Sequence, residues 1–183
     1  YWLIHYYVCM QRRKIRRESD WSTEASNVYK RKENLVDEVF MKKLETGVPS
    51  LLLKEKYILL EINFFGTTPM LESACFQLQQ KNMFPILAHP ERYHLIKDIA
   101  AYTNLKNKGF YFQLNALSLL GHYGPDVKQK AEKLLQAGLY DFVATDAHHP
   151  QHLKTLKTLS LSKKQGIMWE GIREFQLDWF SRD

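Results

Sequence analysis

Two stretches of this sequence end in side chains that can bind a metal ion or a phosphate group. In each, a short apolar run stops abruptly: one run is followed by His89 and Arg92, and a later one by Asp146 and His148. Apolar runs of this length are typical of buried parallel strands, and the ligand sites of α/β folds lie beyond the carboxyl ends of such strands. Asp146 and His148 are two residues apart, so an extended backbone directs both side chains to the same side.

Polar residues stand at four predicted strand ends, which predicts one shared site. These residues are Glu61 and Asn63, His89 and Arg92, Gln113 and Asn115, and Asp146 and His148. A mixed set of carboxylate and imidazole ligands suits Mn, Fe, Zn or Co better than it suits a thiolate-binding metal. Such an ion acidifies water into a nucleophile and polarises a phosphoryl oxygen, and the planar guanidinium of Arg92 suits a phosphate. The chemistry indicated is that of a metal site acting on phosphate.

Alternating strands and helices are predicted to position these residues. Strand starts near residues 57, 86, 110 and 141 are separated by 29, 24 and 31 residues, which is the length of a strand plus a crossover helix. This spacing predicts an α/β fold with a parallel sheet, as a barrel or part of one. The expected elements are a helical face at Leu35, Phe40 and Leu44 ended by Gly47, a strand over residues 57–64, a helix over 70–82, a strand ending at His89, a helix over 99–108, a strand over 110–115, a helix from Pro125 to Gly138, a strand ending at Asp146, and a mostly helical tail over 154–180 with a short strand near Ile167.

The composition is that of a globular domain. The 183 residues are 45% hydrophobic and 25% charged, and no apolar run approaches the roughly 20 residues of a membrane span. The two cysteines, Cys9 and Cys75, are far apart and form no CxxC motif, so we expect no disulfide framework and a reducing cytoplasm as the location. The first residue is Tyr1 rather than Met, which raises the expectation of a fragment.

The positive charge is concentrated at the N-terminus. Residues 1–32 hold eight Lys and Arg against three Asp and Glu, whereas the remainder is close to neutral within a total of +6. A basic segment of this kind contacts nucleic acid or an acidic surface, or it is a solvated arm. We favour the solvated arm and expect no nucleic acid partner, because no aromatic platform accompanies the charge. The predicted organisation is an atypical segment over 1–32 and one domain over 33–183.

Three motifs together resemble a known family. They are Leu87-Ala-His-Pro-Glu-Arg-Tyr93, Gln113-Leu-Asn115 and Ala144-Thr-Asp-Ala-His-His149. They are similar to motifs of the polymerase and histidinol phosphatase superfamily, and most closely to its bacterial tyrosine-protein phosphatases of the capsular and exopolysaccharide type. The resemblance covers about residues 33–159. It implies a distorted βα barrel with two or three metal ions, usually manganese or iron, with zinc as an alternative. The implied substrate is phosphotyrosine on a partner kinase that controls polysaccharide export.

The resemblance also assigns roles to individual residues. His89, Asp146 and His148 fall on metal ligands of the family, and Arg92 falls on the arginine beside the phosphate. Glu33 falls on a bridging carboxylate, because Glu33-Asn-Leu-Val-Asp-Glu-Val-Phe40 matches a family stretch in its spacing. Arg92 and Asp146 are the expected catalytic residues, and either Asp146 or a neighbouring histidine is expected to pass a proton to the leaving phenolate.

Three motifs that open the family are not found in this sequence: a His-X-His strand, an Asp-Asp-Gly and a Thr/Ser-Pro-His. We therefore expect a barrel that is incomplete at its N-terminal strands, in either a truncated enzyme or a degenerate member. Two alternatives to the tyrosine phosphatase follow. One is a binding module without catalysis, and the other is a related phosphoesterase that acts on histidinol phosphate or a nucleotide.

Some of these residues also have simpler structural interpretations. Asp146 is a candidate cap for a helix starting near Pro150, and Arg92 is a candidate partner of Glu91 on the surface. Glu61 is either close to the site or paired with a lysine, and it is left out of the predicted ligand set. The remaining histidines are expected at the surface or outside the ligand set: His94, His122, His149 and His152.

Overall fold

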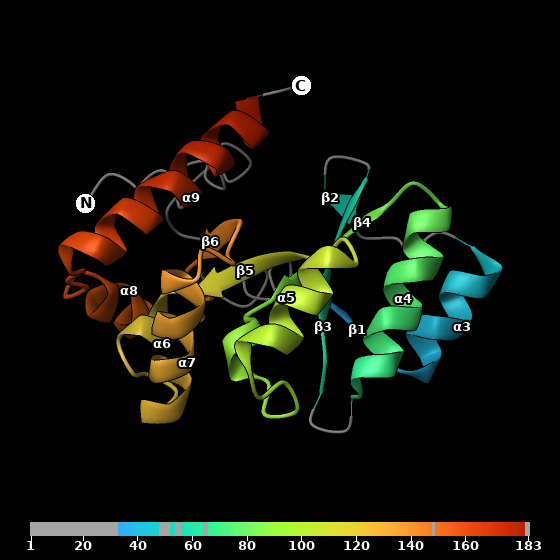
Figure 1. The fold of residues 1–183 in the computed structure, drawn as a ribbon, viewed down its shortest axis with the longest axis horizontal. Helices are drawn as coiled ribbons and strands as arrows, with labels where there is room; N and C mark the ends of the chain where they lie inside the picture. The colour runs from blue at the N-terminus through green and yellow to red at the C-terminus, as the bar shows by residue number, and fades with distance from the viewer. Residues whose placement is uncertain (1–32, 48–51, 54–55, 64–65, 148, 182–183) are drawn as a thin grey trace.

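A computed structural model describes residues 33–47, 52–53, 56–63, 66–147 and 149–181. In these residues a mostly parallel sheet runs through the middle of the molecule, with helices packed against it (Figure 1). The predicted basic segment over 1–32, the end of the first predicted strand at residue 64, Cys9 and His148 lie outside the described residues.

The sheet follows the order β1-β3-β4-β5-β6, and all of these neighbours pair in parallel. A sixth strand, β2, pairs antiparallel with β3. The parallel α/β fold predicted from the spacing is therefore confirmed, and among the described strands β1 and β6 stand at the two ends of the path. The strands are β1 (Asn34–Leu35), β2 (Leu52–Leu53), β3 (Tyr57–Glu61), β4 (Phe84–Ala88), β5 (Tyr111–Asn115) and β6 (Phe142–Ala144).

Local sequence signals explain where the helices start. Asp37, Thr67 and Asp98 each accept a hydrogen bond from a backbone N–H three residues later, so they cap α3, α4 and α5. The helices are α3 (Glu38–Thr46), α4 (Thr68–Gln80), the 3₁₀ turn η1 (Pro90–Arg92), α5 (Ile99–Asn107), α6 (Ala116–Leu119), α7 (Pro125–Gln136), α8 (Pro150–Leu156) and α9 (Lys163–Ser181). The predicted helical tail is confirmed.

Three details of the predicted elements are wrong. Leu35 is not helical but lies in β1, because the capping carboxylate of Asp37 starts the helix later and the residues before it pair with β3. Ile167 lies inside α9 rather than in a strand. β6 ends at Ala144, and Asp146 has a φ of 44°, so its backbone is not extended as predicted.

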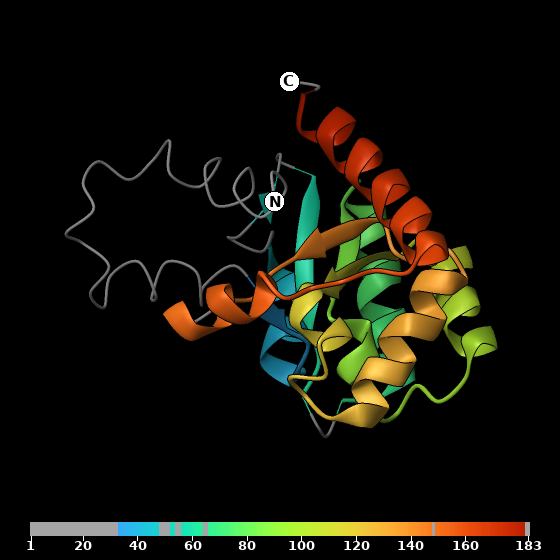
Figure 2. The same ribbon diagram turned by 90° about the vertical axis from the view of Figure 1, so that its left-hand side faces the viewer.

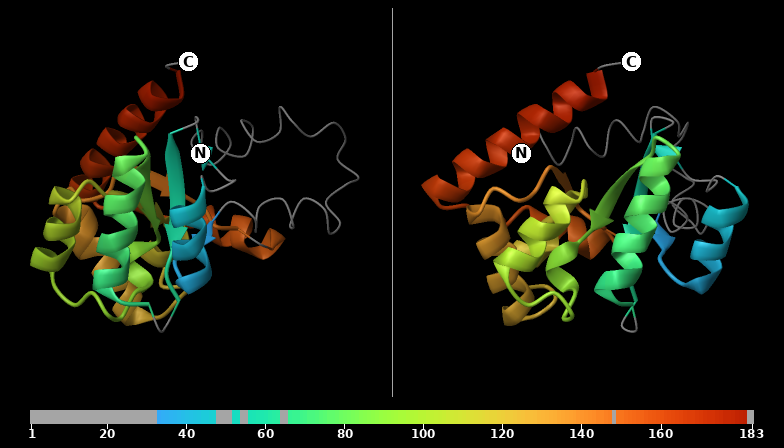
Figure 3. Two further views of the ribbon diagram at one scale, coloured as in Figure 1. Left: turned by 90° about the vertical axis from the view of Figure 1, so that its right-hand side faces the viewer. Right: turned by 45° about the vertical axis from the view of Figure 1, so that its right-hand side comes forward.

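The main core fills the space between the sheet and the helices α3, α4, α5 and α7. Alternate strand residues such as Leu60, Leu87 and Leu114 point into it and are fully buried. Figure 3 shows α3 and α4 together at one end of the molecule and α9 at the other. Each βα unit thereby buries one face of its strand and leaves the polar residues that follow the strand at one edge of the sheet.

The other face of the sheet carries a smaller cluster that α9 covers at the β6 end. Phe142 contacts the aromatic rings of Phe175 and Trp179 of α9, and Figure 2 shows this helix alongside β6. The buried amide of Gln176 accepts a hydrogen bond from the N–H of Val143 at 3.1 Å and donates one to its carbonyl at 3.4 Å. Gln176 therefore satisfies backbone groups of β6 as a neighbouring strand does. In the described helices no segment is long and apolar enough to cross a membrane.

Candidate metal and phosphate site

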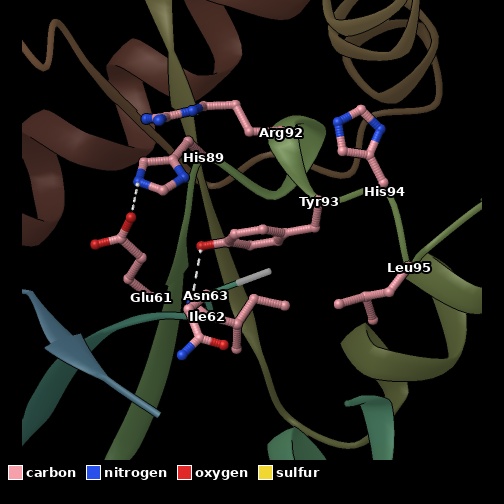
Figure 4. Close-up of a pocket in the computed structure, with 8 residues that line it drawn as sticks. All are labelled: Glu61, Ile62, Asn63, His89, Arg92, Tyr93, His94 and Leu95. Atoms are coloured by element: carbon pink, nitrogen blue, oxygen red, sulfur yellow. Dashed lines mark hydrogen bonds and ion pairs between the residues drawn. The ribbon is translucent and has the colours of Figure 1, made fainter. Parts of the chain in front are cut away.

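Three potential ligands from three strands meet at one point. His89 follows β4, Glu61 ends β3, and Glu33 precedes β1, which pairs with the last residues of β3. The Nε2 atom of His89 lies 3.6 Å from the Glu61 carboxylate and 3.9 Å from that of Glu33. One ligand atom from each residue lies within 4.8 Å of the other two. Figure 4 shows the His89 ring facing Glu61.

The electrostatics of this cluster favour a cation. Burial raises the pKa of Glu61, and the neighbouring Glu33 carboxylate adds to the rise, whereas the imidazole of His89 opposes it. Two carboxylates held side by side repel each other unless a proton or a positive ion lies between them. An ion at this position therefore relieves a repulsion that the fold creates.

The donor set also fits a divalent transition-metal ion chemically. Two carboxylates and one imidazole are ligands that Mn, Fe and Zn accept. Ligand atoms about 2.0–2.2 Å from a shared ion lie about 3–3.5 Å apart, so the observed 3.6 and 3.9 Å require only small inward movements. The Nδ1 atom of buried His89 has no hydrogen-bond partner within the described residues. No described group therefore prevents the tautomer in which Nδ1 carries the hydrogen and Nε2 binds a metal ion.

Arg92 lies in the same pocket. A cavity of about 380 Å³ is lined by Glu61, Ile62, Asn63, His89, Arg92, Tyr93, His94 and Leu95. The buried hydroxyl of Tyr93 donates to the carbonyl of Ala88 at 2.8 Å and accepts from the N–H of Ile62 at 3.3 Å. Tyr93 thus ties the ends of β3 and β4 together beneath the pocket, while Arg92 places a guanidinium beside the carboxylates.

Asp146 is the anchor of Arg92. Its Oδ2 atom accepts hydrogen bonds from Nη1 of Arg92 at 3.3 Å, from Nδ2 of Asn115 at 3.1 Å and from the hydroxyl of Tyr123 at 3.5 Å. These hydrogen bonds fix the position of the Asp146 carboxylate. Asp146 is therefore linked to the ligand cluster through Arg92, and it lies outside the group of three converging ligands.

Both strand ends at the site have an unusual backbone. His89 has a φ of 35° and Asp146 has a φ of 44°, which is the left-handed region that non-glycine residues rarely adopt. Such conformations cost on the order of 1–3 kcal/mol each and persist only where the surrounding structure holds them. The strain coincides with two residues that the sequence singled out.

A buried carboxylate lies beneath the site. Glu91 is 1% exposed and accepts hydrogen bonds from Ser118 Oγ at 2.7 Å, from the hydroxyl of Tyr140 at 3.0 Å and from the N–H of Asn115 at 3.1 Å. Burial raises the pKa of Glu91, and the Ser118 hydrogen bond opposes this rise. Since Glu91 lies between His89 and Arg92 in η1, these bonds fasten the turn that presents both side chains.

Of the predicted site residues, the structure brings together Glu33, His89 and Arg92. Asp146 forms an ion pair with Arg92. His148 lies outside the described residues. Glu61 is the residue that the predicted ligand set left out. Its position at the end of β3, next to the strand that ends at His89, was the available signal, but a lone glutamate at a strand end does not reveal its partner.

Two alternative interpretations from the sequence are wrong. The cap of α8 is His149, whose Nδ1 accepts from the N–H of Gln151, and not Asp146. Arg92 pairs with Asp146 and not with Glu91, because Glu91 is buried with donors of its own. His94 and His122 are exposed, as predicted.

The family follows from a comparison of the whole sequence with known families. Residues 7–163 match the profile of a family described as capsular polysaccharide synthesis, CpsB/CapC. The chain belongs to the CpsB/CapC family. This membership confirms the resemblance that the motifs indicated. The matched range contains Glu33, Glu61 and His89.

Two known proteins are similar to about half of this chain. The tyrosine-protein phosphatase YwqE of Bacillus subtilis is 37% identical over 95 residues, which are 51% of this chain and 37% of that protein. The putative tyrosine-protein phosphatase CapC of Staphylococcus aureus is 30% identical over 96 residues, which are 52% of this chain and 38% of that protein.

A solved structure shares the fold. It comes from work on YwqE from Bacillus subtilis and CpsB from Streptococcus pneumoniae, described as unique metal-dependent tyrosine phosphatases. The TM-score is 0.54 and the identity 29%, over 75% of this chain and 59% of that one. The chain thus spans little more than a third of the lengths of YwqE and CapC, and less than two thirds of the chain in the solved structure.

Proposed function

We propose that this chain carries the site of a metal-dependent phosphatase that hydrolyses phosphotyrosine in proteins. The observation that supports this proposal most is the convergence of Glu33, Glu61 and His89 beside Arg92, at the carboxyl ends of parallel strands. The choice of substrate is supported by the names of two relatives, the tyrosine-protein phosphatase YwqE and the putative tyrosine-protein phosphatase CapC. Two acids and an imidazole next to a guanidinium combine an ion site with a phosphate site.

Each residue has a proposed role. Glu33, Glu61 and His89 hold a divalent transition-metal ion, with Mn²⁺ as first choice and Fe or Zn as alternatives. Asp146 and His148 are proposed to complete a set for two or three ions. A bound ion supplies Lewis acidity and a nucleophile from water at neutral pH.

Arg92 binds the phosphate in this scheme. Its guanidinium presents a planar fork of N–H donors that matches phosphate oxygens. Asp146 accepts a hydrogen bond from Nη1 of Arg92 at 3.3 Å, which keeps the fork at the edge of the pocket. We propose that Asp146, or a neighbouring histidine, passes a proton to the leaving phenolate.

The wider setting is also part of the proposal. The family description links the chain to capsular polysaccharide synthesis, so we propose a tyrosine kinase of polysaccharide export as the phosphorylated partner. We also propose a cytoplasmic location, since buried Cys75 has no disulfide partner among the described residues. The described sheet is proposed to be part of a distorted barrel of the kind that the family resemblance implies.

Turnover of p-nitrophenyl phosphate with added Mn²⁺ tests the activity. We expect hydrolysis by the wild-type chain, at least a hundredfold loss in His89→Ala on the scale seen when a key catalytic group is removed, and little change in His152→Ala, a histidine of α8 outside the cluster. Equal rates for wild type and His89→Ala contradict the proposed site. A chain that folds but shows no turnover favours the binding-module alternative.

The substrate is tested separately. We expect a phosphotyrosine peptide to be hydrolysed with a higher kcat/KM than histidinol phosphate or a nucleoside monophosphate. The opposite order supports the alternative phosphoesterase and rejects tyrosine phosphatase activity, even if the metal site is correct.

A further inference from the structure

Arg92 has a second neighbour whose role neither the sequence motifs nor the relatives assign. Its guanidinium carbon lies 4.6 Å from the ring centroid of Tyr123, within the range of a cation–π contact. The hydroxyl of this tyrosine accepts from Nδ2 of Asn115 at 3.0 Å and approaches Oδ2 of Asp146 at 3.5 Å. The guanidinium is therefore held by a carboxylate and by an aromatic ring that is itself fixed to that carboxylate.

The turn before α7 is built to deliver this ring. Gly121 and Gly124 flank His122 and Tyr123, with φ values of 76° and 98° that only glycine adopts easily. The N–H of Gly124 donates to the carbonyl of Gly121 at 3.0 Å, which closes the turn. His122 packs edge-on against the Tyr123 ring at 4.8 Å between centroids. Tyr123 thus sits on a closed turn, not on an extended loop.

We propose that Tyr123 is a positioning residue that holds the guanidinium of Arg92 in its phosphate-binding place. This inference rests on the proposed function of Arg92 and names a residue that the motifs did not contain. The side chain of Arg92 is 33% exposed, so without a ring beside it the guanidinium can point into solvent in several rotamers. A held guanidinium binds phosphate with less loss of side-chain entropy.

The test compares Tyr123→Leu, which removes the ring, with Tyr123→Phe, which keeps the ring and removes only the hydroxyl. For Tyr123→Leu we expect KM for p-nitrophenyl phosphate and the inhibition constant of inorganic phosphate to rise by roughly 3- to 30-fold, the range of a cation–π contact. Tyr123→Phe should stay within about twofold of wild type, because Asn115 and Arg92 still hold Asp146. Phe76→Leu is the matched control, since this ring is exposed on α4.

A double-mutant cycle separates positioning from general loss of structure. In an Arg92→Ala background, Tyr123→Leu should change phosphate affinity by less than about twofold, because the group that it positions is gone. An equal loss in both backgrounds, an equal loss for Phe and Leu, or no loss for Leu overturns the inference. If Tyr123→Leu does not show a cooperative thermal transition, Tyr123→Met, which also lacks a ring, takes its place.

Failure of the proposed function can be told apart from failure of this inference. If the wild-type chain shows no turnover, the cycle is measured as binding of inorganic phosphate by calorimetry with Mn²⁺ present. A coupling between Tyr123 and Arg92 in that titration supports the positioning role without catalysis. Its absence overturns the role whether or not the chain is an enzyme.

Discussion

Replacing Glu91 by alanine should be one of the most damaging changes in this chain. Its carboxylate is buried and accepts three hydrogen bonds, from Ser118 Oγ, the N–H of Asn115 and the hydroxyl of Tyr140. A buried donor left without an acceptor costs about 1–3 kcal/mol. The change removes the acceptor of three buried donors, so we expect a total loss of about 3–5 kcal/mol.

That loss is a large part of the roughly 5–15 kcal/mol that stabilises a domain. Glu91→Gln is the matched control, because its amide oxygen still accepts from Asn115 and Ser118, and its amide nitrogen can donate to Tyr140. We expect this variant to lose less than about 1.5 kcal/mol. Urea unfolding followed by circular dichroism measures both values.

The stability difference between the wild type and Glu91→Gln should also depend on pH. Burial raises the pKa of Glu91 in the fold above its ordinary value of 4.5. The unfolded chain therefore releases this proton first, and the contribution of Glu91 to stability falls as pH rises from the unfolded pKa to the folded one. Glu91→Gln lacks this slope, so its stability relative to wild type should improve as the pH rises above the ordinary pKa of 4.5. An alanine variant that loses less than about 1 kcal/mol, or parallel pH profiles for wild type and Gln, refutes the reasoning.

Three further predictions concern separate parts of the fold. Glu61→Gln should raise the melting temperature in EDTA, because it removes a carboxylate that faces Glu33. The same change should reduce the increase in melting temperature that added Mn²⁺ causes. Thermal scans with and without the metal check both effects. Gln176→Leu should cost about 1–3 kcal/mol in urea unfolding by leaving β6 backbone groups unpaired, whereas Gln129→Leu on the exposed face of α7 should cost little. Gly124→Ala should lower the unfolding free energy by about 1–3 kcal/mol because its φ is 98°, whereas Gly171→Ala inside α9 should stabilise by about 0.5–1 kcal/mol; equal effects of the two changes contradict the strained turn.

Regular periodicity made much of the fold predictable. The βα spacing gave the parallel sheet, and the glycines after α5 and α7 marked where those helices end, since both adopt positive φ values. The errors came from competition between local and tertiary signals. The sequence prediction places Leu35 on a helical face with Phe40 and Leu44, but pairing with β3 decides its conformation. Ile167 is β-branched, yet it lies in a 19-residue helix that packs on the sheet.

The candidate site was predictable where a motif encodes it and not where only three-dimensional proximity does. His89 and Arg92 share one motif, and the structure places them in one pocket. Glu61 lies beside His89 because β3 and β4 pair in the sheet. The spacing of the two residues along the chain does not reveal this pairing. Asn115 and Tyr123 reach Asp146 from different elements, so their contacts depend on the turn before α7. Side-chain networks of this kind depend on the three-dimensional fold and cannot be predicted from sequence motifs.

Calorimetric titration of Mn²⁺ into the metal-stripped chain tests the central claim most directly. We predict saturable binding to the wild type and at least tenfold weaker binding to His89→Ala, while His152→Ala binds as the wild type does. At a free Mn²⁺ concentration of about 100 times the dissociation constant, binding should also stabilise the fold by about 2.7 kcal/mol. Equal Mn²⁺ affinities for the wild type and His89→Ala contradict a metal centre at Glu33, Glu61 and His89.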